Sequence, residues 1–346
     1  MSALDIEGLT VALPPGADRP HALRGVSLRL DRSEILCVVG ESGSGKSVMA
    51  MAAMRLLAPG LRVEAGRVLL AGTDLLALSE EGMRRVRGRR VAMVFQEPMT
   101  ALNPLMTVGD QLAEMWRAHT DLPAAEVRAR SVEALREVAL PDPEGALRAF
   151  PHELSGGQRQ RAMIAMALAL EPEALICDEP TTALDVTTQA QVLALIRDLQ
   201  RRRGTAVLFI THDFGVVSQV CTKILVMYAG RAAEYAGKRE VLTKPHHPYT
   251  RGLMGSIPHL VDETTERLAE IPSPHVKMVR GKGLFIGVEL KPQAGGARRF
   301  CEALQAKGIL AKETHEHVIR FAPPLIIDRA TIDGAVEPIT EVLNQP

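Results

Sequence analysis

One segment of this 346-residue chain has the residue types and spacing that bind phosphate. The run GESGSGKS, from Gly40 to Ser47, fits the pattern G-x-x-x-x-G-K-[ST] and follows an apolar run. Its glycines let backbone N–H groups turn inward around phosphate oxygens, and the dipole of the following helix adds to their field. Lys46 would reach the β- and γ-phosphates, and Ser47 would bind Mg2+. We expect a nucleotide site here rather than a chance glycine-rich turn. Its residues would be Gly40, Ser42, Gly43, Gly45, Lys46 and Ser47.

Two acidic residues end a second apolar run. Asp178 and Glu179 close the sequence ALICDE, which reads as a buried strand. A carboxylate at the C-terminal end of a central parallel strand lies beside the phosphate site of such a sheet. Asp178 would then hold Mg2+ through water, and Glu179 would act as general base on the attacking water. Alone, the pair would indicate a solvated loop, and the phosphate-binding run favours the catalytic interpretation.

A second anion site is indicated by the run LSGGQRQR, residues 154–161. Ser155 is typical of a helix N-cap, and Gly156 and Gly157 expose N–H groups at the positive end of the helix. An ordinary capped surface helix explains the serine but not the two glycines. Because one loop already holds the phosphates, a second site makes sense if two subunits enclose each nucleotide between them.

Two further polar residues follow strand candidates. Gln96 comes after RVAMVF and His212 comes after AVLFIT. Either residue alone is more often structural. Because both follow strands, as Lys46 and Glu179 do, we expect all four at the same edge of the sheet. Gln96 would reach the metal and the water, and His212 would donate to the γ-phosphate.

These motifs need strands and helices in alternation to position them. The strand EILCVV precedes the phosphate loop, and the helix-forming run SVMAMAAMRLL follows it. Residues 110–148 are polar and rich in Ala and Arg, which indicates helices. Apolar strands alternating with helices predict an α/β fold, with a mostly parallel sheet covered on both faces.

Composition limits the classes of partner and compartment. Lys plus Arg and Asp plus Glu both number 41, and aromatic residues are 3% of the chain, so neither bulk charge nor base stacking favours nucleic acid. The four cysteines are far apart, which argues against a local zinc or iron–sulfur motif and fits a reducing compartment. The first residues do not read as a signal peptide, and the longest apolar run, 162–170, is too short to span a bilayer. Any membrane role would therefore act through a partner that spans the bilayer.

Together these motifs resemble the ATP-binding cassette (ABC) ATPase family over roughly residues 1–260. In chain order they correspond to Walker A (40–47), the Q-loop Gln96, the signature LSGGQ (154–158), Walker B (Asp178 and Glu179), the D-loop (Ala183, Leu184 and Asp185) and the switch His212. The runs FQEPMTALNPLMTVGDQL (95–112) and PHHPYTRGLMGSIP (245–258) are most similar to the oligopeptide, dipeptide and nickel importer branch.

The resemblance implies an ATP hydrolase that binds ATP and Mg2+ at the cytoplasmic face of the inner membrane. Two such subunits, identical or related, would pair head to tail. In that pair, each subunit would also contact the nucleotide bound by the other subunit, through Ser155, Gly156, Gly157, Gln158 and Asp185. Catalysis would use Glu179, His212 and Gln96, and the metal would be held by Ser47, Gln96 and Asp178. The dimer would drive a membrane permease docked after Gln96, fed indirectly by a solute-binding protein, with no role for nucleic acid.

Three departures from this branch stand out. The N-terminal region offers no aromatic residue for stacking on adenine, only His21, so adenine affinity should be modest. Residue 33 is Ser where the family commonly has Gly. The cysteine-bearing segment that this branch usually has after the HPYT run (residues 247–250) is missing. Residues from about 264 to 346 instead resemble the C-terminal end of ornithine aminotransferase, a pyridoxal-phosphate enzyme. The runs SPHVKMVRGKGLFIGVELK (273–291) and GILAKETHEHVIRFAPPLII (308–327) carry that resemblance.

The aminotransferase-like segment leaves several interpretations open. In that family the arginine of IRFAPP, here Arg320, helps to hold a substrate carboxylate. The upstream lysine and aspartate that bind the cofactor have no counterpart here, and Lys282 is not in a Schiff-base context, so we do not predict transamination. The segment could be an inactive remnant, an added module or an artefact of a spliced gene model. A fragment of this kind would expose apolar surface, with the strand GLFIGVEL as the main liability.

The predicted organisation is an ATP-binding domain at 1–260, a linker at 261–273 and the aminotransferase-like segment at 274–346. The leading hypothesis is an importer ATPase for peptides, nickel or related small solutes. The alternatives are a chimera without transport function, a soluble cassette ATPase of DNA repair or translation, and a metabolic aminotransferase.

Overall fold

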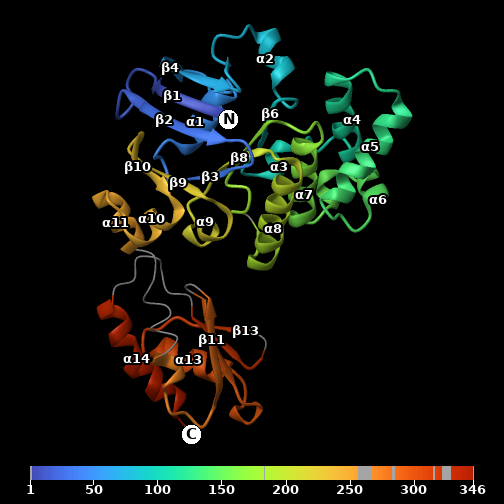
Figure 1. Cartoon of the computed structure of the whole chain (residues 1–346). Helices are drawn as coiled ribbons and strands as arrows, with labels where there is room; N and C mark the ends of the chain where they lie inside the picture. The colour runs from blue at the N-terminus through green and yellow to red at the C-terminus, as the bar shows by residue number, and fades with distance from the viewer. Residues whose placement is uncertain are drawn as a thin grey trace. The chain divides into compact units, whose positions relative to one another are not determined.

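A computed structural model describes residues 2–182, 184–255, 267–282, 285–314, 316–321 and 329–345. The chain divides into two compact units, Met1–Thr250 and Arg251–Pro346, drawn in Figure 1 from blue to orange and from orange to red. The predicted domain borders at 260 and 273 stay a prediction, and residues 261–266 of the expected linker lie outside the described residues.

The larger sheet of the first unit has the strand order β10-β9-β3-β8-β7-β6. Its strands are β3 (Ile35–Val39), β6 (Val91–Val94), β7 (Ala174–Asp178), β8 (Ala206–Ile210), β9 (Lys223–Tyr228) and β10 (Arg231–Gly237). The strands from β9 to β6 run parallel, and β10 is antiparallel to β9. Every residue of β3, β6, β7 and β8 is buried, which explains why they read as unbroken apolar runs. The expected mostly parallel sheet is therefore confirmed.

A second, antiparallel sheet was not expected from the sequence. Its order is β2-β1-β4-β5, formed by β1 (Ser2–Ala12), β2 (His21–Asp31), β4 (Arg62–Leu70) and β5 (Thr73–Asp74). Apolar side chains from β1, β2 and β4 share one buried core with those of β3, β8 and the first helix. The two sheets thus pack around the helix that follows the phosphate-binding run.

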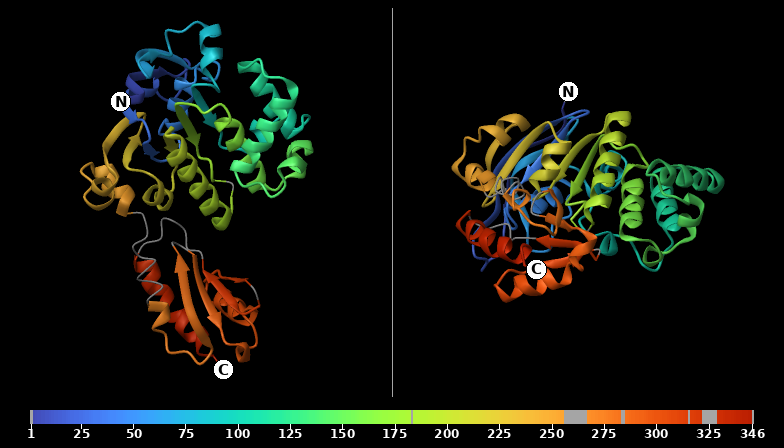
Figure 2. Two further views of the ribbon diagram at one scale, coloured as in Figure 1. Left: turned by 45° about the vertical axis from the view of Figure 1, so that its right-hand side comes forward. Right: turned by 90° about the horizontal axis from the view of Figure 1, so that it is seen from below.

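Helices flank the sheets and form a lateral lobe. They are α1 (Lys46–Ala53), α2 (Glu80–Val86), α3 (Pro98–Ala101), α4 (Val108–His119), α5 (Ala124–Glu137), α6 (Pro143–Arg148), α7 (Gly156–Leu168), α8 (Val186–Arg203), α9 (Phe214–Val220), α10 (Lys238–Thr243) and α11 (Pro248–Gly255). The expected helical region is the green lobe α4–α6, which stands beside the sheet in both views of Figure 2. None of the helices in the described ranges has the length and apolarity to cross a bilayer.

The described part of the second unit contains a small antiparallel sheet and the helices α13 and α14. The strand order is β11-β12-β14-β13, and the elements are β11 (Val276–Lys282), β12 (Phe285–Leu290), α13 (Arg298–Ala306), β13 (Lys312–Thr314), β14 (Val318–Phe321) and α14 (Arg329–Leu343). A core of its own joins the sheet to both helices. The expected liability of GLFIGVEL is not seen in its described part, because β12 is paired with both β11 and β14, and Ile286, Val288 and Leu290 are buried. Exposed large apolar side chains do occur elsewhere in this unit, at Met278 and Leu310.

Candidate functional site

The glycine-rich loop lies between the end of β3 and the start of α1. Gly40 and Gly45 have left-handed backbones, with φ of +152° and +102°. A Cβ atom at Gly40 would lie 2.2 Å from the carbonyl oxygen of Met227, and one at Gly45 would lie 2.9 Å from that of Ala22. Both positions therefore require glycine, because other backbone segments pack directly against the loop.

The loop encloses the ammonium group of its own lysine. Lys46 is 5% exposed, and its Nζ donates to the carbonyl oxygens of Gly40 at 2.8 Å and Glu41 at 2.9 Å. Burial lowers the pKa of Lys46, and the negative charges of Glu179, Asp178 and Glu41 oppose that shift. Two carbonyl oxygens of the loop therefore hold the Lys46 ammonium group, and the carboxylates of Glu179, Asp178 and Glu41 act on it.

The hydroxyl that begins α1 meets a carboxylate from β7. Ser47 Oγ donates a hydrogen bond to Asp178 Oδ1 at 3.1 Å. Asp178 is 4% exposed, and burial raises its pKa, with the hydrogen bond from Ser47 opposing the shift. A hydroxyl and a carboxylate are the oxygen ligands that Mg2+ accepts in proteins, so these two residues fit a magnesium site. The Oγ atom of Ser44 is buried without a partner within the described ranges, which fits a loop built to receive further hydrogen-bonding groups.

The carboxylate of Glu179 is the meeting point of three side chains. Its Oε2 accepts from Gln96 Nε2 at 3.3 Å and from Thr182 Oγ1 at 2.9 Å, and it lies 3.2 Å from His212 Nδ1. Glu179 itself has φ of +48°, which is uncommon for a residue with a side chain. Such a backbone is retained where the surroundings fix it, often at functional positions. The structure therefore brings Gln96, Glu179 and His212 together at the predicted edge, and it adds Thr182, which sequence reasoning missed.

The run LSGGQ forms the start of α7 as a reciprocal cap. Ser155 Oγ accepts from the N–H of Gln158 at 3.3 Å, and Gln158 Oε1 accepts from the N–H of Ser155 at 2.8 Å. A Cβ at Gly157 would lie 2.6 Å from a methyl carbon of Thr188, so the starts of α7 and α8 touch there. Asp185 caps α8 by accepting the N–H of Thr188 at 3.0 Å. The D-loop residue Ala183 lies outside the described residues.

No polar contact joins the two groups of site residues in the described part of the first unit. Among the described residues, no hydrogen bond or ion pair joins 155–158 to the loop 40–47 or to Glu179. The structure thus assembles one phosphate-side cluster, formed by Lys46, Ser47, Gln96, Asp178, Glu179 and His212. Within the described residues, the capped start of α7 makes no hydrogen bond or ion pair with this cluster.

The region expected to meet adenine has an arginine and a histidine instead of an aromatic stack. Arg19 donates to the carbonyl oxygen of Gly43 in the phosphate loop at 2.9 Å. His21 Nε2 lies 2.9 Å from Glu64 Oε2. Both border a hollow of about 620 Å³ whose lining contains no Phe, Tyr or Trp. The absence of an aromatic residue noted in the sequence therefore extends to the folded surroundings of this hollow.

Two protein families match the chain, each over a different part. The ABC transporter family matches residues 23–182, and the class-III aminotransferase family matches residues 249–343. Both resemblances drawn from the sequence are thereby confirmed at the level of the family.

Named relatives and solved structures agree with the first match. A probable peptide ABC transporter ATP-binding protein of Sinorhizobium fredii is 51% identical over 78% of this chain and 81% of its own length. An oligopeptide transport ATP-binding protein of Bacillus subtilis is 47% identical over 78% of this chain and 75% of its own length. A dimeric ATP-binding cassette bound to ADP and Pi, in a post-hydrolysis state, superposes with a TM-score of 0.61 at 27% identity. The match covers 68% of this chain and 99% of that structure.

Proposed function

Because the chain belongs to the ABC transporter family, we propose that it hydrolyses ATP to power the uptake of peptides, nickel or related small solutes through a partner permease. The observation that carries this proposal is the convergence of Lys46, Asp178 and Glu179 at one edge of the parallel sheet. The peptide class is favoured by the named relatives in Sinorhizobium fredii and Bacillus subtilis.

In this proposal the loop between β3 and α1 binds the phosphates. Its N–H groups and the start of α1 present positive potential to the phosphate oxygens, and Lys46 adds a full charge. Ser47 and Asp178 would hold Mg2+, with Gln96 close enough to Glu179 to share in the site. When bound, the metal neutralises charge on the phosphates.

Glu179 is the proposed general base. Its carboxylate accepts the proton of the attacking water as the water oxygen bonds to the terminal phosphorus and the bond to the ADP oxygen breaks. Thr182 and Gln96 both donate hydrogen bonds to Oε2 of this carboxylate. His212 Nδ1 lies 3.2 Å from the same oxygen. From this position His212 would donate a hydrogen bond to the terminal phosphate as negative charge develops on it.

The separate start of α7 supports a paired arrangement. Ser155, Gly157 and Gln158 lie at the start of α7, where the helix dipole favours an anion, yet among the described residues they make no hydrogen bond to the phosphate-side cluster of their own chain. In the proposed head-to-tail pair they would meet the nucleotide held by the Lys46 of a second subunit, with Asp185 in the same contact. That second subunit could be identical or a related ATPase.

The proposed permease contact lies after Gln96. Met99 and Leu105 are large apolar side chains that are 49% and 86% exposed there. Such exposed apolar residues fit a protein contact. The proposed place of the subunit is the cytoplasmic face of the inner membrane, with a solute-binding protein as an indirect partner.

The test is size-exclusion chromatography of Glu179→Gln with and without ATP and Mg2+, with Lys46→Ala as the control. Glu179→Gln should lower turnover by roughly 10²- to 10⁴-fold, the usual contribution of a general base. It should elute as a dimer only with ATP, while Lys46→Ala should neither bind ATP nor dimerise. Turnover retained by both variants would refute the site.

We propose no transamination for this chain. The class-III aminotransferase match begins at residue 249, and Arg320 stands on β14 between Gly287 of β12 and Lys312 of β13. The expected counterpart of the cofactor-binding domain would precede that match, where this chain has its ATP-binding cassette.

A further inference from the structure

The HPYT run, which pointed to the importer branch, contacts the phosphate loop. The N–H of Glu41, the second residue of that loop, donates to Tyr249 Oη at 3.2 Å, across 208 positions of sequence. The ring of Tyr249 packs on Tyr228, with ring centroids 4.3 Å apart and planes at 34°. Tyr228 is the last residue of β9, next to β3 in the sheet, so the contact lies at the edge where the phosphate loop begins.

The segment that carries Tyr249 is itself fixed by a buried carboxylate. Glu234 of β10 is 9% exposed and accepts the N–H groups of His246 at 2.9 Å and His247 at 3.1 Å. Tyr249 follows as the second residue of α11, and its own N–H donates to His247 Nδ1 at 3.1 Å. Thr250, the next residue, is fully buried. The tyrosine is therefore held from behind by a built structure.

The peptide unit between Gly40 and Glu41 is bound at both ends. Its carbonyl oxygen accepts from Lys46 Nζ at 2.8 Å, and its N–H donates to Tyr249. Hydrogen bonds on the two ends of one amide polarise each other, so the bond to Tyr249 strengthens the acceptor that faces Lys46. The other acceptor of the Lys46 ammonium is the carbonyl of Glu41 itself. Fixing this residue therefore fixes both oxygens around the cation.

We propose that Tyr249 is a positioning residue that sets the entry of the phosphate loop, and through it the Lys46 ammonium, for nucleotide binding. This inference rests on the proposed ATPase function and adds a role for the HPYT run within it. The competing explanation is that Tyr249 only packs against Tyr228 and stabilises the fold.

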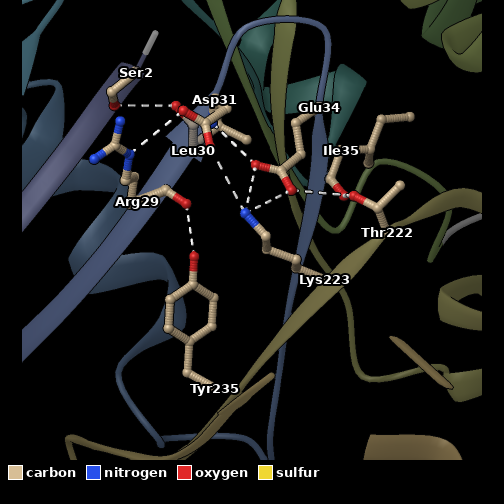
Figure 3. Close-up of polar contacts among 9 residues, drawn as sticks. All are labelled: Ser2, Arg29, Leu30, Asp31, Glu34, Ile35, Thr222, Lys223 and Tyr235. Atoms are coloured by element: carbon tan, nitrogen blue, oxygen red, sulfur yellow. Dashed lines mark hydrogen bonds and ion pairs between the residues drawn. The ribbon is translucent and has the colours of Figure 1, made fainter. Parts of the chain in front are cut away.

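Two tyrosine-to-phenylalanine variants separate these explanations. Tyr249→Phe keeps the ring on Tyr228 and removes only the acceptor of the Glu41 N–H. Tyr235→Phe is the matched control, because Tyr235 Oη also bonds to the backbone, donating to the carbonyl of Arg29 at 2.7 Å. Figure 3 shows that this bond belongs to a polar group around Lys223 and Glu34. Neither of these residues is part of the loop 40–47.

The experiment uses the full chain and measures ATP binding by calorimetry and steady-state ATPase rates, with thermal unfolding as a check on folding. For Tyr249→Phe we expect the Kd and the KM for ATP to rise roughly three- to tenfold, the effect of one hydrogen bond of ordinary strength, with kcat unchanged. Tyr235→Phe should lose comparable thermal stability and keep the wild-type Kd and KM. This split between KM and kcat is not expected from a loss of packing alone.

Each contrary result has one meaning. Unchanged ATP affinity in Tyr249→Phe, beside a wild-type chain that binds ATP, would overturn the positioning role and leave the proposed function standing. An equal loss of affinity in Tyr235→Phe would also overturn it, because the effect would then be one of general stability. A wild-type chain that binds no ATP would overturn the proposed function itself, and this inference with it.

Discussion

Replacing Glu234 with Gln tests whether a buried carboxylate holds the HPYT segment in place. The wild-type side chain accepts two successive N–H groups, from His246 and His247, at 2.9 and 3.1 Å. Glutamine has nearly the same shape but only one acceptor oxygen, and its NH2 group would face the second N–H. The substitution therefore changes the hydrogen bonding of the segment while leaving its packing almost intact.

The expected loss can be estimated from these contacts. One charge-assisted hydrogen bond contributes about 1.5–3 kcal/mol, and a donor left facing a donor costs about 1–3 kcal/mol more. We expect Glu234→Gln to lower stability by about 2–4 kcal/mol, unless the segment detaches locally at lower cost. In that case hydrogen exchange at residues 246–250 would rise sharply while the midpoint of global unfolding moved little.

The pH dependence gives the prediction its sign. Burial raises the pKa of Glu234, but the hydrogen bonds from the segment outweigh burial and hold it below its ordinary value of about 4.5. A carboxylate whose folded pKa is depressed adds stability above its unfolded pKa and loses it as the pH falls through the folded value. The difference in stability between wild type and Glu234→Gln should therefore be full above about pH 4.5 and shrink below it.

The assay is urea unfolding from pH 3 to 7, roughly the span over which such a carboxylate titrates, paired with hydrogen exchange of the segment. The control is Glu240→Gln. Glu240 is exposed and pairs with His246 at 3.1 Å, so its loss should cost under about 1 kcal/mol. The reasoning is refuted if Glu234→Gln matches wild type in both stability and exchange, or if its loss is independent of pH.

Three further predictions concern the cassette. In Gly40→Ala the new Cβ would lie 2.2 Å from the Met227 carbonyl oxygen. The substitution should therefore destabilise the chain by about 3 kcal/mol or more, or displace the loop and remove ATP binding. Measurements of unfolding and of ATP binding would check this. Ser155→Ala should cost only about 1 kcal/mol of stability as a lost N-cap, yet it should reduce ATPase activity at least tenfold if Ser155 also meets the partner's nucleotide; equal small losses in both would leave Ser155 a cap alone. A chain cut after residue 272 should retain ATPase activity, whereas one cut after residue 247 should bind ATP more weakly because it lacks Tyr249.

The chemistry-bearing loops were predictable because their signals are local. The glycines of residues 40–47 and the cap at Ser155 are read from neighbours within a few positions, and the structure shows the backbone constraints that those residue types serve. The strands beneath them were equally legible, since a strand buried on both faces leaves an unbroken apolar run.

The features that were missed depend on partners far away in sequence. Thr182 is an ordinary loop residue until the strained backbone of Glu179 turns that carboxylate toward it. The strands of the antiparallel sheet have exposed residues, and bulges interrupt their pairing. Their apolar pattern in the sequence is therefore weaker than that of the buried strands. Ser33 shows the same limit, because its φ of +57° explains why glycine suits this turn, yet the sequence does not reveal the angle.

The contacts along the chain indicate how far the ATP-binding unit depends on the aminotransferase-like segment. Tyr249 hydrogen-bonds to the phosphate loop, and the first compact unit ends at Thr250. The second unit has its own buried core, and β12 is an interior strand of its sheet. Neither unit therefore needs the other to bury its main apolar surface. We therefore expect ATPase activity not to depend on the residues after 272, provided that Tyr249 and the segment that holds it are intact.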